Sequence, residues 1–395
     1  MSGGLTGGPT GGMEGLPDDD ERRARAALTR VAEPGEPAVA AAVQAHGAVE
    51  VWHALRRGRS IGAVSQRALP GLALRAQDCE PAADLEAAQR CGARLVCPGE
   101  PEWPAARLTW SPEGLLEAPP FALWVRGPHR LGAVVERSVA IVGARAASRY
   151  GESVALELAG SLATREVAVV SGAAYGIDSF AHRGALDGGG APTVAVLACG
   201  VDVAYPRGNE RLLTRIAEGG LVVSELPVGR HPTRRHFLTR NRLIAALSLG
   251  TVVVEAATRS GSLATLERAR MLERHVMAVP GSVLSPMSAG CHEQIRNGAT
   301  CVTRAEEVLE LVGRMGTDAA LPRPARTSPR DGLSDQVRRV LDAVPARGAA
   351  GVGAIAREAG VTPRVVQQVL PPLQAHGLVD RTADGFRLTS LGASR

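Results

Sequence analysis

The stretch V-A-I-V-G-A-R-A-A-S-R-Y-G, residues 139–151, begins with an apolar run of β type and continues with small and polar residues. A segment with helical periodicity follows, from Tyr150 to Thr164. Continuous apolar runs that alternate with amphipathic helices are typical of parallel strands covered on both faces. The sequence therefore predicts an α/β fold with a Rossmann-like doubly wound parallel sheet. Five more such runs, spaced 24 to 30 residues apart, begin near Val167, Thr193, Leu221, Thr251 and His275.

Composition predicts two further segments before this sheet. Residues 1–36 are rich in Gly, Pro and acidic residues, which bury too little apolar surface to offset chain entropy, so we expect a disordered tail. Residues 37–78 contain apolar-periodic pieces broken by His46-Gly47 and indicate a small helical domain. Modules of the sterile-alpha-motif or helix-hairpin-helix kind have this pattern.

The sheet belongs to an extended Rossmann-like domain over residues 79–315, in which residues 84–130 are expected to add a βαβ edge. Residues 316–332 form a linker rich in Pro, Arg, Thr and Ser. Residues 333–395 contain three short helical segments and a hairpin that turns at Asp384-Gly385, and this order predicts a winged-helix domain. We expect Pro371-Pro372 to interrupt the third helix.

Composition also excludes several kinds of chemistry. The 45 basic residues are all arginine, so neither a Schiff-base lysine nor a P-loop lysine is present. The six cysteines have neither CxxC spacing nor a metal-ligand spacing with histidine, so we expect reduced thiols in a cytoplasmic protein and no metal site. No run approaches the ~20 apolar residues of a membrane span, so we expect a soluble, non-exported protein.

The residues that end the predicted strands indicate a binding site. Ligands of open parallel sheets bind beyond the carboxyl ends of the strands, where small residues let backbone amides approach an anion. In the first loop, Arg145 and Ser148 stand where a dinucleotide fingerprint has its second and third glycines, which argues against NAD or FAD and leaves no cofactor expected. The arginines predicted to converge on this edge are Arg145, Arg207, Arg240, Arg242 and Arg259.

The segment G-R-H-P-T-R-R-H-F-L-T-R-N-R, residues 229–242, has five arginines and no acidic residue. Guanidinium groups around an aromatic ring suit a phosphate backbone with unpaired bases. We interpret Arg240 and Arg242 as groove residues at the start of an apolar helix over residues 243–249. For Arg230, Arg234 and Arg235, which come earlier in the segment, two interpretations stay open. They belong to the binding site, or they form a solvated connection that leads to it.

No catalytic constellation accompanies these arginines. Asp178 and His182 lie four residues apart on one predicted helix and could form an acid/base pair. The alternative is that Asp178 caps the helix near its N-terminus and that His182 is a satisfied polar residue. Because no nucleophile or metal set joins them, we do not expect an enzyme.

Six motifs occur in one order at regular spacing: V-A-I-V-G-A-R-A-A-S-R-Y-G, S-G-A-A-Y-G-I-D-S-F-A-H, Y-P-R-G-N-E-R-L, F-L-T-R-N-R-L-I-A-A-L-S, V-V-V-E-A-A-T-R-S-G-S-L-A-T and V-M-A-V-P-G. Together they resemble the DNA-processing protein A (DprA/Smf) family over about residues 83–311. The resemblance implies a cytosolic homodimer that binds single-stranded DNA without catalysis. It also implies that the protein protects incoming DNA during natural transformation, displaces single-strand-binding protein and loads a RecA-type recombinase.

The family's DNA-contacting positions carry over by motif. The sequence departs from the family at Leu238, where the F-P-x-R-N-R element has proline, and in its lack of groove lysines. The residues implied as nucleic-acid-binding are Gly143, Arg145, Ser148, Ser171, Gly172, Arg207, Arg240, Asn241, Arg242, Arg259, Ser260, Gly261 and Ser262. Replacing Arg240 and Arg242 together by alanine is expected to reduce oligo-dT binding and to leave the fold intact.

Two alternatives belong to other classes. Rossmann-like proteins that resemble the LOG phosphoribohydrolases cleave nucleoside monophosphates at a related edge, but their P-G-G-x-G-T-x-x-E signature is missing and Glu255-Ala-Ala-Thr-Arg-Ser-Gly-Ser stands in its place. Base release that depends on Glu255 would favour that enzyme. A transcription regulator led by the winged helix would require a preference for duplex DNA that survives moderate salt.

Overall fold

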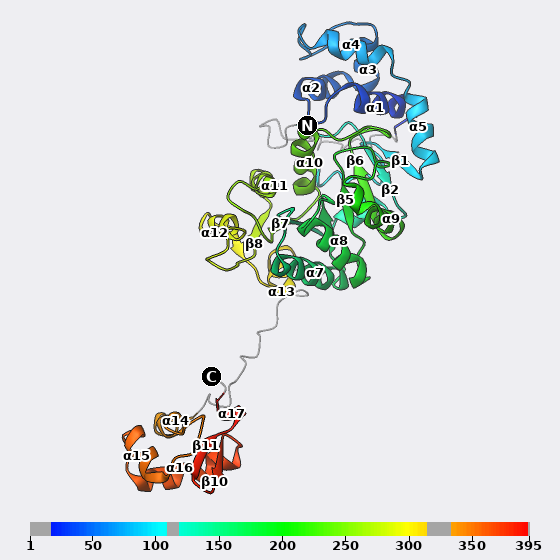
Figure 1. Cartoon of the computed structure of the whole chain (residues 1–395). Helices are drawn as coiled ribbons and strands as arrows, with labels where there is room; N and C mark the ends of the chain where they lie inside the picture. Colours follow the sequence, from blue (N-terminus) through cyan, green and yellow to red (C-terminus); the bar gives the residue numbers. More distant parts are fainter. Residues whose placement is uncertain (1–16, 109–117, 314–332, 394–395) are drawn as a thin grey trace, which may run out of the picture. The chain divides into compact units, whose positions relative to one another are not determined.

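The structure is a computed structural model that describes residues 17–108, 118–313 and 333–393 (Figure 1). The chain divides into two compact units, residues 1–320 and 321–395. The first unit contains a nine-stranded sheet and its covering helices. The strands of this sheet are β1 (Ala93–Val96), β2 (Leu123–Arg126), β3 (Ser138–Val142), β4 (Ala168–Ser171), β5 (Val194–Val196), β6 (Leu221–Ser224), β7 (Gly250–Val253), β8 (His275–Ala278) and β9 (Thr300–Cys301).

The strand order is β1-β2-β6-β5-β4-β3-β7-β8-β9, and every neighbouring pair from β6 to β9 is parallel. The predicted doubly wound parallel sheet is therefore confirmed, with the six predicted runs forming β3 to β8. The βαβ edge expected over residues 84–130 is wrong. There β1 pairs with β2 antiparallel, with Ala93 opposite Arg126, and β2 pairs antiparallel with β6, whereas a βαβ unit requires parallel strands.

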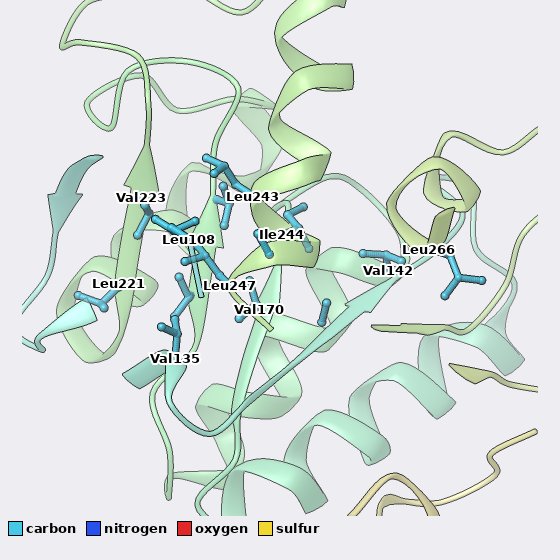
Figure 2. Packing of buried hydrophobic residues seen from close by; sticks show 14 of the residues in the cluster. Leu108, Val135, Val142, Val170, Leu221, Val223, Leu243, Ile244, Leu247 and Leu266 are labelled. Carbon is cyan, nitrogen blue, oxygen red and sulfur yellow. The ribbon is translucent and has the colours of Figure 1, made fainter. Parts of the chain in front are cut away.

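Helices cover both faces of the sheet because alternate strand residues point to opposite sides. Val139 and Ile141 of β3 pack with α7 (Arg149–Thr164) and α8 (Ile177–Gly188), whereas Ala140 and Val142 pack with α10 (Arg234–Ala246) and α11 (Gly261–Met271). Figure 2 shows this second core, in which Leu243 and Ile244 of α10 meet strand residues. The helices of this part are α5 (Pro81–Arg90), α6 (Leu131–Val135), α7 (Arg149–Thr164), α8 (Ile177–Gly188), α9 (Glu210–Gly219), α10 (Arg234–Ala246), α11 (Gly261–Met271), α12 (Ala289–Arg296) and α13 (Ala305–Val312).

A bundle of four helices precedes the sheet: α1 (Asp19–Val31), α2 (Pro37–His46), α3 (Ala48–Arg56) and α4 (Leu69–Gln77). The expectation of a disordered tail through residue 36 is wrong for α1, and residues 1–16 of that tail lie outside the described part. Asp18 caps α1 by accepting the Glu21 amide at 2.8 Å, and acidic side chains in a first turn complement the helix dipole. The average composition of the segment concealed the buried face that α1 presents through Leu28 and Val31.

The bundle is attached to the sheet by polar contacts as well as by packing. The Arg30 guanidinium pairs with the Asp84 carboxylate of α5 at 2.5 Å. The indole Nε1 of Trp124, a fully buried residue of β2, donates to Thr29 Oγ1 at 3.1 Å. These contacts make the bundle and the sheet parts of one unit.

The second unit consists of α14 (Asp335–Asp342), α15 (Val352–Ala359), α16 (Pro363–Ala375), the hairpin β10 (Val379–Thr382) and β11 (Gly385–Leu388), and α17 (Ser390–Ala393). The interruption expected at Pro371-Pro372 is wrong, because both prolines lie inside α16. Leu370 and Leu373, on either side of the prolines, are buried in the core of the unit, and this packing holds the last turns of the helix. The winged-helix interpretation stays a prediction.

Candidate nucleic-acid-binding site

A cavity of about 460 Å³ lies at the carboxyl edge of the sheet, between α10 and α11 and beneath the loops that follow β3 and β7. One part of its wall is apolar, with Val142, Ile244 and Met287, and another part carries positive charge. The predicted site residues that line it are Gly143, Arg145, Arg240, Asn241, Arg259, Ser260, Gly261 and Ser262. The structure therefore brings together residues from three of the six motifs.

Arg240 forms the floor of the basic part. The side chain is only 7% exposed, and its Nη1 donates to the carbonyl oxygens of Gly172 at 2.7 Å and Val196 at 2.5 Å. Its Nε has no hydrogen-bond partner among the described residues. Burial lowers the pKa of Arg240 to about 10, so the group remains charged at neutral pH. A buried cation with an unused donor is suited to an anionic ligand.

Asp178, which sequence reasoning left outside the site, also lines the cavity. Its Oδ2 accepts the backbone amides of Gly172 at 3.1 Å and Ala174 at 3.4 Å. Burial raises the pKa of this carboxyl group, and the Arg240 guanidinium opposes that rise. Asp178 thus fixes the turn after β4, against which the Arg240 guanidinium packs. A Cβ at Gly172 would overlap that guanidinium, which explains the glycine.

His182 does not form an acid/base pair with Asp178. Its ring is fully buried, and Nδ1 hydrogen-bonds with Thr193 Oγ1 at 2.8 Å. Burial lowers the pKa of His182 to about 3, so the imidazole is neutral at physiological pH. The geometry therefore does not favour the acid/base pair. The alternative is correct only in part, because His182 Nε2 has no hydrogen-bond partner among the described residues. Asp178 does not cap α8, since it accepts the amides of the preceding turn and the helix has no side-chain cap.

The start of α11 forms the opposite wall. Ser260 caps this helix by accepting the Ser262 amide at 3.4 Å, and the two serine Oγ atoms are 2.7 Å apart. The free amides of a helix N-terminus and its positive dipole favour an anion, and exposed Arg259 adds a full charge beside them. Asn241 Nδ2 donates to the Gly261 carbonyl at 3.4 Å and joins α10 to this wall.

An aromatic cluster lies at the rim. The guanidinium carbon of Arg145 is 5.1 Å from the centroid of the Phe237 ring, and the Tyr205 ring lies 5.4 Å from Phe237 at an interplanar angle of 50°. Tyr205 is 41% exposed, so part of its ring is available to a ligand. Such rings stack with unpaired bases. Phe237 is the single phenylalanine of the arginine-rich segment, but only the fold brings Tyr205 to it.

Five predicted residues do not line the cavity. Ser148 caps α7, and its Oγ donates to Glu255 Oε1 at 2.6 Å. Ser171 Oγ is buried and donates to the Ile141 carbonyl at 2.6 Å, while Gly172 contacts the cavity only through Arg240. Arg207 is exposed on a short 3-10 turn, Arg207–Asn209. The fifth residue is Arg242.

Arg242 is buried in the core, contrary to the prediction of a groove residue. It is 1% exposed, and its Nη2 donates to Glu225 Oε1 at 2.5 Å. The cause is the length of α10. The helix begins at Arg234, not near Leu243 as predicted, so Arg240 and Arg242 both lie on it. Residues i and i+2 of a helix point to different sides, so these two arginines cannot share a site.

The start of the arginine-rich segment contacts the helical bundle. Arg230 and the buried ring of His236 both approach Glu33, at 3.6 Å and 3.1 Å. Arg235 lies 3.9 Å from Glu36. These acidic residues follow α1, in the segment that sequence reasoning took as disordered. They supply the counter-charges that let this basic segment pack.

The described residues contain no cluster of three or more His, Cys, Asp or Glu side chains that could hold a metal ion. No described helix is long and apolar enough to cross a membrane.

A doubly wound sheet with a basic, partly apolar cavity at its carboxyl edge defines a Rossmann-like protein with a candidate anion-binding site. The sequence profile of the DNA recombination-mediator protein A family matches residues 94–313. A relative from Mycobacterium tuberculosis that carries the DprA name is 45% identical over 383 residues, which cover 95% of this chain and 97% of the relative. The chain therefore belongs to the DNA recombination-mediator protein A (DprA/Smf) family.

Other relatives match in part. Protein Smf of Escherichia coli is 45% identical over 192 residues, which cover 48% of this chain and 50% of that protein. The X-ray structure of DNA processing protein A from Streptococcus pneumoniae superposes with a TM-score of 0.60 at 30% identity and covers 75% of this chain and 98% of that chain.

Proposed function

We propose that this protein binds single-stranded DNA at the carboxyl-edge cavity, chiefly through backbone phosphates, with little sequence preference. The observation that carries the proposal is the buried Arg240 guanidinium, whose Nε has no partner in the described part and which lines a cavity shared with Arg145 and Arg259. Three guanidinium groups and a helix N-terminus provide donors for a phosphate, and the rings of Phe237 and Tyr205 suit unpaired bases.

The test is fluorescence anisotropy with a labelled oligo-dT at several salt concentrations. Arg145 and Arg259 are exposed, so replacing both with alanine should leave the fold intact. We expect affinity to fall by tenfold or more and the log–log salt slope to become shallower by about 0.7 for each lost phosphate contact. The matched control is alanine at Arg90 and Arg215, two exposed arginines in weak surface ion pairs on α5 and α9. Unchanged affinity of the Arg145/Arg259 variant would refute the site.

We also propose that the protein protects incoming DNA and loads a RecA-type recombinase onto it. Membership of the family supports it, as does a site that would contact the DNA backbone without reading sequence. We expect the protein to act as a homodimer in the cytoplasm and to help the recombinase replace single-strand-binding protein. Recombinase ATPase activity on DNA coated with that protein should rise with the wild type and not with the Arg145/Arg259 variant. Light scattering would measure the dimer.

The LOG-like alternative depends on Glu255, and the position of that residue does not favour it. Glu255 is 2% exposed and accepts the amide of Ser148 at 2.9 Å and its hydroxyl at 2.6 Å, beneath the N-terminus of α7. It does not line the cavity. A carboxylate in this position stabilises the helix start. Incubation with nucleoside monophosphates should therefore release no free base, and chromatography would detect any that forms.

A further inference from the structure

The connection between α3 and α4, residues 57–68, reads R-G-R-S-I-G-A-V-S-Q-R-A and contains three arginines and no acidic residue. Arg57, Arg59 and Arg67 are all exposed, and none has an ion pair or side-chain hydrogen bond with another described residue. Neighbouring Arg56 is already engaged, since it stacks over Trp52 and lies 3.4 Å from Glu80. The connection therefore holds concentrated positive charge that no described acidic residue pairs with.

The connection is also fixed in shape, which distinguishes it from a solvated charge run. Val64 is 2% exposed and packs in the core of the bundle. Ser60 Oγ donates to the Val64 carbonyl at 2.9 Å, and Ser65 Oγ accepts the Ala68 amide at 3.3 Å. A loop anchored in this way presents its arginines with less backbone entropy to lose when a ligand binds.

The bundle lies next to the start of the helix that lines the cavity. In Figure 1, α2 is drawn beyond the first turn of α10, where His236 contacts Glu33 at 3.1 Å and Arg235 approaches Glu36. Arg234, the first residue of α10, is exposed and has no ion pair with the described residues. A strand that leaves the cavity along α10 would meet Arg234 first and the bundle next.

We propose that the α3–α4 connection is a second phosphate-contacting surface for the same single strand, so that the DNA path extends from the cavity over the helical bundle. This inference rests on the proposed function of the cavity. The guanidinium fork matches phosphate oxygens. The connection contains no aromatic residue, so it contacts the backbone and stacks no bases. Its contribution is therefore independent of sequence and dependent on oligonucleotide length.

The experiment compares the full-length wild type with a variant in which Arg57, Arg59 and Arg67 are each replaced by glutamine. Affinity is measured by anisotropy for a short oligo-dT, sufficient for the cavity, and for a long one. We expect unchanged affinity for the short strand, about a tenfold loss for the long strand, and a salt slope for the long strand that is shallower by about 2. The control replaces three exposed arginines of α5 and α9, Arg90, Arg211 and Arg215, and so removes the same charge.

Each other outcome overturns the inference. If the wild type binds and the triple variant keeps its affinity and salt slope for the long strand, the path does not cross the bundle, while the cavity proposal stands. An equal loss in the control variant would assign the effect to net charge. If the triple variant no longer binds phosphatidylglycerol vesicles that the wild type binds, while its salt slope for the long oligo-dT is unchanged, the arginines contact a lipid surface and not DNA. A wild type that binds neither strand would refute the cavity proposal itself.

Discussion

The ion pair between Arg242 and Glu225 allows structural and ligand-binding roles to be separated by measurement. Both side chains are buried, with 1% and 8% of their surfaces exposed, and the Nη2–Oε1 distance is 2.5 Å. Burial raises the pKa of Glu225, and the adjacent guanidinium opposes that rise. If Arg242 is replaced by alanine, the carboxylate remains in the core without its counter-charge. Family motifs alone would have described the same substitution as the loss of a phosphate ligand.

The expected cost follows from the desolvation of an unpaired charge. Breaking a buried ion pair by removing one partner costs about 3–5 kcal/mol. We therefore expect Arg242→Ala to lower the free energy of unfolding by about 3–5 kcal/mol. Replacing both members with apolar residues of similar size, Arg242→Met with Glu225→Leu, should recover most of that loss, because apolar replacement of a buried pair is often neutral. Alanine at exposed Arg259 should change stability by only about 0.5 kcal/mol.

Urea denaturation followed by circular dichroism measures the stability of Arg242→Ala, Arg242→Met/Glu225→Leu and Arg259→Ala. Anisotropy at urea concentrations below the unfolding transition measures their binding to oligo-dT. We expect Arg242→Ala to lower the free energy of unfolding, and Arg259→Ala to lower the affinity for oligo-dT with little change in stability. The Arg242→Met/Glu225→Leu variant should bind like the wild type. If Arg242→Ala were as stable as the wild type and yet failed to bind DNA, Arg242 would be a DNA ligand and the structural assignment would be refuted.

Three further predictions concern single residues. Lysine at Arg240 keeps the charge but lacks the planar guanidinium, whose Nη1 holds two carbonyls while its Nε has no partner among the described residues. We therefore expect about tenfold weaker oligo-dT binding for Arg240→Lys, whereas Arg259→Lys should be tolerated; equal affinities in anisotropy would contradict this. The pKa of His182 falls from 6.5 to about 3 on burial, so the neutral ring contributes stability above pH 6.5 that is lost as pH falls towards 3. Between pH 6.5 and 5 this loss is about 2 kcal/mol, and urea midpoints should show that His182→Gln removes it. Exposed Cys301 should react with iodoacetamide at pH 8, while Cys199, whose pKa burial raises to about 12, should react only after unfolding, as peptide mass spectrometry would show.

The parallel sheet could be predicted because its signal is local and repeated. Each strand from β3 to β8 is a short apolar run, and each helix between them has an amphipathic period. The edge strands β1 and β2 carry the same kind of run, but strand direction is set by pairing with β6, which is almost a hundred residues away in the chain. α1 was missed for a different reason. Its charged residues dominate the average composition, although its apolar face and its cap are regular.

The residues of the cavity were predicted where a loop alone brings them to the sheet edge, as at Gly143, Arg145 and Arg259 to Ser262. The sequence pattern presents Asp178 only as a cap or a base, because nothing in the sequence shows that the turn after β4 lies beside Arg240. Tyr205 and Phe237 are far apart in the chain, and no local pattern of the sequence predicts that their rings are in contact.

The basic segment that ends in Arg240-Asn-Arg242 shows how an error of helix length becomes an error of function. Taken as a loop, the segment can direct every arginine to one ligand. Because the segment is helical from Arg234 onward, successive side chains point in different directions around the helix axis. Arg240 and Asn241 then face the cavity, Arg242 faces Glu225, and Arg235 and His236 face the helical bundle. The same helix thus contacts both the candidate DNA site and the helical bundle, through different side chains.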